Sequence, residues 1–213
     1  MRPLVFAFSI AFAAPLPQAH AQSPEARDGL LFMVGAGFGA LTQRNEGALD
    51  QLDAAHFDRP YFAYGLHTDL QLRFHDRLRA GLGVRYVRTG RKTTRDTAGA
   101  RPTETRSFRV HGIVPELSLT PLLARAGVVT FGLRAAGGYG TARWRMGNAV
   151  TQNGMYTASA ALDIEVDFRD SQAGLGVRVG YRLERTRGLG ALELPIDLST
   201  AFIDIHLTWG NTL

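Results

Sequence analysis

Residues 172–183 read QAGLGVRVGYRL and alternate between two kinds of side chain. Every second position from Leu175 to Leu183 is apolar, and glycine and arginine fill the positions between them. Because successive side chains of a β-strand point to opposite faces, this stretch predicts a strand with one apolar and one charged face. Apolar side chains toward lipid and polar ones toward a lumen are typical of a closed barrel in a bilayer.

The same two-sided pattern recurs along the chain and predicts eight strands. We expect these strands at residues 29–41, 61–74, 78–90, 106–122, 128–146, 156–168, 173–186 and 198–209. The connections between them are predicted to alternate, beginning with a long one, as in outer-membrane barrels with long extracellular loops and short periplasmic turns. The sequence therefore predicts an all-β protein, a closed eight-stranded antiparallel up-and-down transmembrane β-barrel.

Three local features add expectations about the barrel wall. Pro115 has no N–H to give to a ladder, so it predicts a bulge in the fourth strand. Gly137 and Gly138 are the point at which the fifth strand is expected to change phase. Aromatic side chains are predicted to form girdles at both membrane interfaces, with Trp144 in the extracellular girdle and Trp209 in the periplasmic one.

The N-terminus carries the features of an export signal. Arg2 precedes an apolar run at 4–14, and the triplet Ala-His-Ala at 19–21 has the pattern of a cleavage site. The chain has no cysteine, which excludes disulfides and thiolate-metal sites. We expect a signal peptide at 1–21, cut after Ala21, a short periplasmic segment at 22–28 and one barrel domain at 29–213.

With this pattern and loop order, the chain resembles the small eight-stranded outer-membrane β-barrel proteins, the opacity, attachment-invasion and OmpA-barrel-like group. The resemblance covers residues 29–209 and rests on no specific motif. It implies a monomer in the outer membrane of a Gram-negative cell envelope, in contact with outer-membrane lipid and lipopolysaccharide and inserted by the barrel-assembly machinery. Members of the group usually end on an aromatic residue, and Trp209 is expected to serve that role here.

Charged residues on the predicted inward faces are expected to meet in the lumen. An eight-stranded barrel is just wide enough for side chains to fill its interior, and a buried charge is costly unless it is paired. We therefore expect ion pairs to plug the lumen, with Arg178 and Arg182 facing the three carboxylates of strand 156–168; a narrow porin-like channel for small solutes is the alternative. The predicted lumenal network comprises Arg73, Arg79, Arg85, Glu116, Arg134, Asp163, Glu165, Asp167, Arg178, Arg182, Asp204 and His206.

A basic segment follows the third strand and is expected to form an extracellular loop. Arg88, Arg91, Lys92 and Arg95 lie in this segment or beside it. Arginine makes bidentate contacts with phosphate, so the segment is either a contact for lipopolysaccharide phosphates or a solvated flexible loop. It has no interleaved aromatic residues, and an exported chain does not meet nucleic acid, so no nucleic-acid partner is predicted.

The sequence predicts no catalytic residues, no cofactor and no metal site. Ser159 and His206 share the predicted lumenal side, but no local motif marks a nucleophile, and His206 is interpreted as the partner of a carboxylate. The glycines of GAGFGA, residues 35–40, lack the spacing of a dinucleotide-binding loop and are interpreted as giving the barrel wall either tight curvature or room for bulky lumenal side chains. We expect a structural or interaction role, in envelope integrity or surface contact, and not an enzyme. A soluble periplasmic lipocalin-like or sandwich binding protein is the second alternative.

Overall fold

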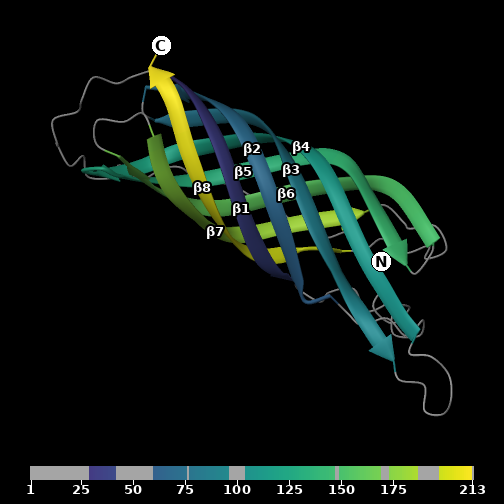
Figure 1. Ribbon diagram of the computed structural model, residues 1–213. Helices are drawn as coiled ribbons and strands as arrows, with labels where there is room; N and C mark the ends of the chain where they lie inside the picture. Colours follow the sequence, from purple (N-terminus) through teal and green to yellow (C-terminus); the bar gives the residue numbers. More distant parts are fainter. Residues whose placement is uncertain are drawn as a thin grey trace, which may run out of the picture.

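Eight antiparallel strands form one closed barrel, in which each strand pairs with its neighbours in sequence and β8 pairs with β1 (Figure 1). The computed structural model describes residues 29–41, 60–75, 77–95, 104–146, 149–168, 173–186 and 197–212. The predicted closed, antiparallel up-and-down barrel is confirmed. Among the described residues, no helix is long and apolar enough to cross a membrane. The strands are β1 (Gly29–Leu41), β2 (Phe62–Phe74), β3 (Leu78–Arg95), β4 (Glu104–Ala126), β5 (Val129–Met146), β6 (Ala149–Asp167), β7 (Ala173–Thr186) and β8 (Thr200–Thr212).

The two ends of the barrel differ in the strands that reach them. β1, β3, β5 and β7 finish at one end, which we term the loop end, and begin at the other, the turn end. At the loop end β3, β4, β5 and β6 extend farthest (Figure 1). The prediction of a long loop at 147–154 is wrong, because β5 ends at Met146 and β6 already begins at Ala149. The strict alternation of long and short connections therefore fails at this hairpin.

The basic segment after residue 90 is also strand rather than loop. β3 continues to Arg95, and its last residues pair in register with β4, from Arg91 opposite Phe108 to Arg95 opposite Glu104. The sequence lost its apolar alternation here, which is why a loop was predicted. Backbone hydrogen bonding needs no particular side chain, so a long hairpin can continue past the last apolar position.

The outer wall is apolar around the middle of the barrel. Leu82 on β3 is 61% exposed and Leu117 on β4 is 68% exposed, although both are large hydrophobic residues. This exposure pattern on β2, β3, β6 and β8 agrees with the recurring alternation of apolar and polar faces that the sequence predicts. Tyr64, Tyr139 and Tyr156 lie exposed toward the loop end, and Phe74, Phe168 and Trp209 lie exposed toward the turn end.

The wall bulges at a different place from the one predicted. The ladder between β4 and β5 keeps one register across Pro115, with Ile113 opposite Thr141 and Glu116 opposite Gly138. The register shifts instead at Leu122 to Ala124, near the turn end. A Cβ at Gly138 would collide with the carbonyl oxygen of Pro115, so β5 accommodates the proline by close backbone approach and not by an extra residue.

The predicted change of phase in β5 is also wrong. Thr130, Arg134 and Trp144 all point inward, so the alternation runs unbroken through Gly137 and Gly138. Trp144 is 4% exposed and faces the interior. It therefore cannot belong to the lipid-facing girdle in which it was predicted.

Glycines in the wall make room for side chains of the interior. A Cβ at Gly37 would collide with the carboxylate of Asp204, and a Cβ at Gly176 would collide with the ring of His206. Gly35 is equally close to the ring of His67. Of the two interpretations of the GAGFGA glycines, these close contacts support space for lumenal neighbours.

Candidate functional site

The interior of the barrel has two parts with different chemistry. Charged side chains fill the part from the turn end to the middle, and we term this the charged layer. Hydrophobic side chains fill the part toward the loop end, and we term this the apolar cluster. The apolar cluster consists of Ala63, Val87, Phe108, Val110, Val114, Ala142, Trp144, Met155 and Leu198, with Leu41 packed against it.

Among the described residues, five arginine–carboxylate pairs with N–O distances of 3.3 Å or less hold the charged layer together. All ten side chains are nearly inaccessible to solvent, because they project into the barrel from its wall. The contacts are Arg79 Nη1 to Glu165 Oε2 at 2.5 Å, Arg85 Nε to Glu184 Oε1 at 2.9 Å, Arg134 Nη2 to Asp69 Oδ2 at 2.7 Å, Arg178 Nε to Asp163 Oδ2 at 3.1 Å, and Arg182 Nη2 to Asp204 Oδ2 at 3.3 Å.

Three of the five pairs cross the interior between strands that are not neighbours. Arg79 reaches from β3 to β6, Arg85 from β3 to β7, and Arg134 from β5 to β2. Opposite walls of the barrel are thereby tied together directly. The other two pairs join adjacent strands.

The partners predicted for β7 are only partly right. Arg178 lies directly opposite Asp163 in the ladder and pairs with it as expected. Glu165 pairs with Arg79 instead, and Asp167 pairs at 3.0 Å with Arg125 at the turn end, where both side chains are partly exposed. Register between adjacent strands predicts neighbours along the wall, but a long arginine in a narrow barrel also reaches the far wall.

His206 lies among the carboxylates of β6. Its Nε2 is 3.4 Å from Asp163 Oδ1 and 3.9 Å from Glu165 Oε2, and its side chain is buried. Thr208, on the same face of β8, donates a hydrogen bond of 2.8 Å from its hydroxyl to Glu165 Oε1. The structure therefore places His206 beside carboxylates, as interpreted from the sequence.

Ser159 and His206 are not brought together. Ser159 is opposite Arg182 on β7, whereas His206 is opposite Gly176. These two β7 positions are six residues apart, which is roughly 20 Å along a strand. Ser159 and His206 are therefore too far apart to act together as a nucleophile and its base. Within the described residues, no group of three or more His, Asp or Glu side chains is placed to hold a metal ion.

The remaining predicted lumenal residues also face inward. Glu116 is buried near the middle of the barrel, and Arg73 is half-buried near the turn end. Glu116, Arg85, Arg134 and Arg182 line a central void of about 10 Å³. A void of this size holds on the order of one water molecule.

Some interior residues were missed in the predicted network. Arg178 Nη1 donates a hydrogen bond of 3.0 Å to His67 Nε2, and its Nη2 contacts the sulfur of Met33. His67 shares the polar face of β2 with Asp69, so the alternation of that strand carried its signal. Met33 lies in an apolar segment without polar alternation, and nothing in the sequence marked it as lumenal.

The apolar cluster was also missed, because the lumen was expected to be polar throughout. The rings of Phe108 and Trp144 pack edge to face with centroids 6.2 Å apart, on the neighbouring strands β4 and β5. Met155 from β6 and Leu198, which precedes β8, pack into the same group. The signal was the inward spacing of Phe108, Val110 and Val114 in β4.

Among the basic residues predicted to contact lipopolysaccharide, Arg88 is exposed on the outer wall. The other three, Arg91, Lys92 and Arg95, belong to strand β3 and not to a loop. The structure adds three outward arginines that were not predicted, namely Arg109, Arg143 and Arg145 on β4 and β5.

No protein-family model and no curated protein matches the sequence. Among solved structures, the chain is similar to neisserial surface protein A, with a TM-score of 0.52 and 11% identity over 84% of this chain and 96% of that one. It also matches the N-terminal β-barrel domain of Pseudomonas aeruginosa OprF, with a TM-score of 0.46 and 9% identity over 86% of this chain and 99% of that one. A match to Ail, the attachment invasion locus protein of Yersinia pestis, has a TM-score of 0.35 and 8% identity over 88% of this chain and 100% of that one. The first likeness confirms the predicted resemblance in fold to the small eight-stranded outer-membrane barrels.

Proposed function

We propose that this chain is an integral protein of the bacterial outer membrane with a structural or interaction role, in envelope integrity or surface contact, and a lumen plugged by ion pairs. The observation that carries the proposal is that polar and apolar side chains are placed the opposite way round from those of a soluble protein. The side chains on the outer wall are apolar and exposed, whereas the interior holds buried arginines and carboxylates. A bilayer is the solvent that suits such a wall.

The soluble alternative is disfavoured by the same observation. A soluble lipocalin-like barrel or sandwich keeps its apolar side chains inside and its charges in water. Here Leu82 and Leu117 would instead face water while Arg79 and Glu165 are buried. Exposing a belt of large apolar side chains to water costs about 25 cal/mol for each Å².

A closed lumen is supported by two features of the interior. Three ion pairs bridge opposite walls, and the void lined by Arg85 and Arg134 is about 10 Å³. The apolar cluster fills the interior toward the loop end. No contact among the described residues favours the narrow channel over this packing.

The remaining parts of the proposal concern biogenesis and partners. We propose export by the segment 1–21, which lies outside the described residues, and insertion as a monomer by the barrel-assembly machinery. A non-enzymatic role is supported by the separation of Ser159 and His206 along the barrel.

Membrane assembly tests the proposal with two arginine substitutions on one strand. Leu162 and Gln152 both point outward on β6, but Leu162 lies in the apolar band and Gln152 lies toward the loop end. Arginine at the bilayer midplane costs about 2–4 kcal/mol, and near the interface about 0–1 kcal/mol. Leu162→Arg should therefore block heat-modifiable migration on gels, whereas Gln152→Arg should retain it. A native chain that is soluble without detergent, with both variants folded, would overturn the proposal.

A further inference from the structure

The outer wall carries a cluster of cations at the loop end that takes no part in the lumenal pairs. In the ladder, His111 lies between Arg88 and Arg143, and Arg109 lies opposite Arg145. All five side chains are on the outward face, and the four arginines are exposed. We term this group the outer cationic patch.

Among the side chains that the structure describes on β3, β4 and β5, none next to the patch is acidic. Among the described side chains of β3, β4 and β5, Glu116 is the one carboxylate, and it points into the barrel. Like charges directly opposite each other destabilise a sheet. An anion bound from outside beside Arg88 and Arg109 would relieve repulsion of this kind.

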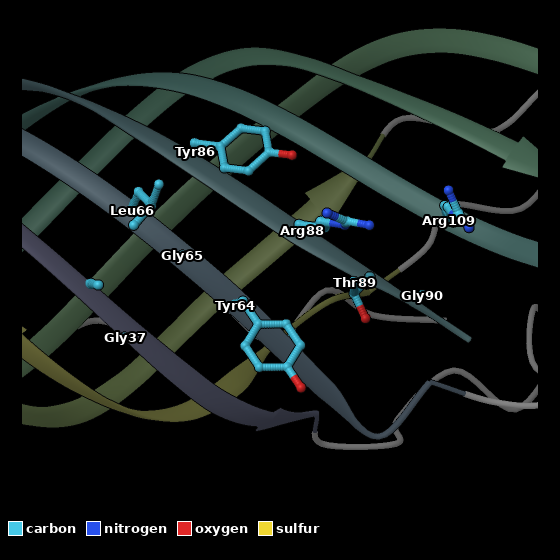
Figure 2. Close-up of a pocket in the computed structure, with 10 residues that line it drawn as sticks. Gly37, Tyr64, Gly65, Leu66, Tyr86, Arg88, Thr89, Gly90 and Arg109 are labelled. Carbon is cyan, nitrogen blue, oxygen red and sulfur yellow. The ribbon is translucent and has the colours of Figure 1, made fainter. Parts of the chain in front are cut away.

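A groove on the outer wall adjoins the patch. It has a volume of about 600 Å³ and crosses from β1 to β4. Figure 2 shows Tyr64 and Leu66 on one strand beside Tyr86 and Arg88 on the next, with Arg109 farther along. The groove is therefore apolar over most of its length and cationic at the end nearest the loop end of the barrel.

Contacts within the wall help to shape this groove. The Tyr86 hydroxyl and His111 Nδ1 are 2.6 Å apart and hydrogen-bonded, which joins the groove to the patch. The small side chain of Ala36 forms the wall on β1, where Phe38 comes two residues later on the same face. A larger residue at position 36 would occupy part of the space.

The position of the patch along the strands indicates its depth, given the membrane location proposed above. On β3 the outward residues are apolar from Leu78 to Tyr86, and the first outward cation is Arg88. On β5 they are uncharged up to Thr141, and the first outward cation is Arg143. Arginine is costly at the midplane and tolerated near the interface, and tyrosine favours the headgroup level. The patch thus lies where lipid phosphates lie in the outer leaflet.

We propose that the outer cationic patch and its groove bind one phosphorylated lipid of the outer leaflet. Arg88 and Arg109 hold the phosphate of the headgroup, since the guanidinium group makes paired hydrogen bonds with phosphate oxygens. An acyl chain lies along Tyr64, Leu66 and Ala36. This site rests on the proposed membrane location and uses the wall of the barrel, in place of the loop contact expected from the sequence.

Native mass spectrometry of the whole mature chain in detergent micelles tests the site, with three probes. The probes are hexa-acylated lipid A carrying both phosphates, the same lipid A without phosphates, and inorganic pyrophosphate. We expect one molecule of phosphorylated lipid A to bind per chain and the dephosphorylated lipid to bind at least about tenfold more weakly, since hydrogen bonds to charged groups are strong. Pyrophosphate at the same concentration should not displace the lipid.

Two pairs of variants separate charge from shape. Arg88→Gln with Arg109→Gln should weaken lipid binding by about tenfold or more, whereas Arg77→Gln with Arg125→Gln removes the same charge at the turn end and should not. Ala36→Phe should weaken binding by filling the groove. Ala160→Phe, on the outer wall of β6, is its control and should bind normally.

Several outcomes would overturn the site. One is equal binding of the phosphorylated and dephosphorylated lipids, and another is lipid binding by the Arg88 and Arg109 double variant that equals that of the native chain. A third is full displacement of the lipid by pyrophosphate, which would mean that the groove holds no acyl chain. A dimer of the chain that Ala36→Phe dissociates would assign the groove to a second copy instead. If the variants stay heat-modifiable in these cases, the membrane barrel itself stands and the lipid site alone fails.

Discussion

The charged layer and the apolar cluster fill the same barrel in two different ways. In the charged layer, Arg79 and Glu165 meet across the interior from walls that are not adjacent. In the apolar cluster, Phe108 and Trp144 pack side by side from neighbouring strands. The first part depends on a few directional contacts between distant strands, and the second on many non-directional contacts between close ones.

The wall is therefore supported differently at the two levels of the barrel. Where the outer face is apolar, the proposed bilayer surrounds the wall and the interior carries the polar residues. Toward the loop end the outer face carries Arg109, Arg143 and Arg145, and the interior becomes apolar. At the loop end the barrel thus has polar side chains outside and apolar ones inside, as a soluble protein has. This agrees with the extension of β3 to β6 beyond the other strands at that end (Figure 1).

The charged layer should be the part most sensitive to a single change. Arg79→Ala leaves Glu165 buried without its arginine, and removing one partner of a buried pair costs about 3–5 kcal/mol. Urea unfolding in detergent micelles measures this loss. The double variant Arg79→Met with Glu165→Leu leaves no charge unpaired and should lose less. A free energy of unfolding for Arg79→Ala within about 1 kcal/mol of the native value would contradict the role of this pair.

The apolar cluster should respond as a small hydrophobic core. Met155→Ala removes a fully buried side chain that packs against Val87, and the expected loss is about 2–3 kcal/mol, toward the lower end of the usual range because the cluster is small. Val150→Ala on the same strand is the control, since Val150 is outward and exposed, and it should lose less than about 1 kcal/mol. Equal losses for both, in the same urea titration, would argue against a packed cluster.

The partners in the charged layer can be separated by double-mutant cycles. Arg79 with Glu165 and Arg178 with Asp163 are in contact, so each pair should show a coupling of about 1–3 kcal/mol. Arg178 with Glu165, one of the pairings that the sequence left open between the facing strands, should show a clearly smaller coupling. A larger coupling for Arg178 with Glu165 would restore the partners predicted from the sequence.

The smallest effect is expected at the turn end. Arg125 and Asp167 form an ion pair at 3.0 Å with side chains 38% and 24% exposed. Water screens such a pair, so Arg125→Ala should change the free energy of unfolding by about 1 kcal/mol or less. A loss as large as that of Arg79→Ala would show that exposure does not separate the two kinds of pair.

The sequence predicted the faces of the strands better than their contacts. β1 and β7 have the bounds expected from alternation, and Asp163, Glu165 and Asp204 are buried on the inward face. Alternation is a local property, so it assigns each side chain to a face. It does not say which distant strand lies across the interior, and the partners of Arg79 and Arg85 therefore could not be derived from it.

Other misses have local physical causes. The start of β6 at Ala149 was hidden because residues 149–155 lack apolar alternation, although they continue the ladder of β6 opposite β5. Pro115 was expected to need a bulge, but close approach of Gly138 removed that need. The outer cationic patch combines residues from three strands, so its members were too far apart in sequence to be seen together.

Conductance of the native mature chain in a planar lipid bilayer tests most directly whether the charged layer and the apolar cluster together close the lumen. With cross-barrel pairs in place and a central void of about 10 Å³, we expect no steady current and at most rare, brief openings. A stable, long-lived conductance of the native protein would contradict the account and assign the interior to a channel.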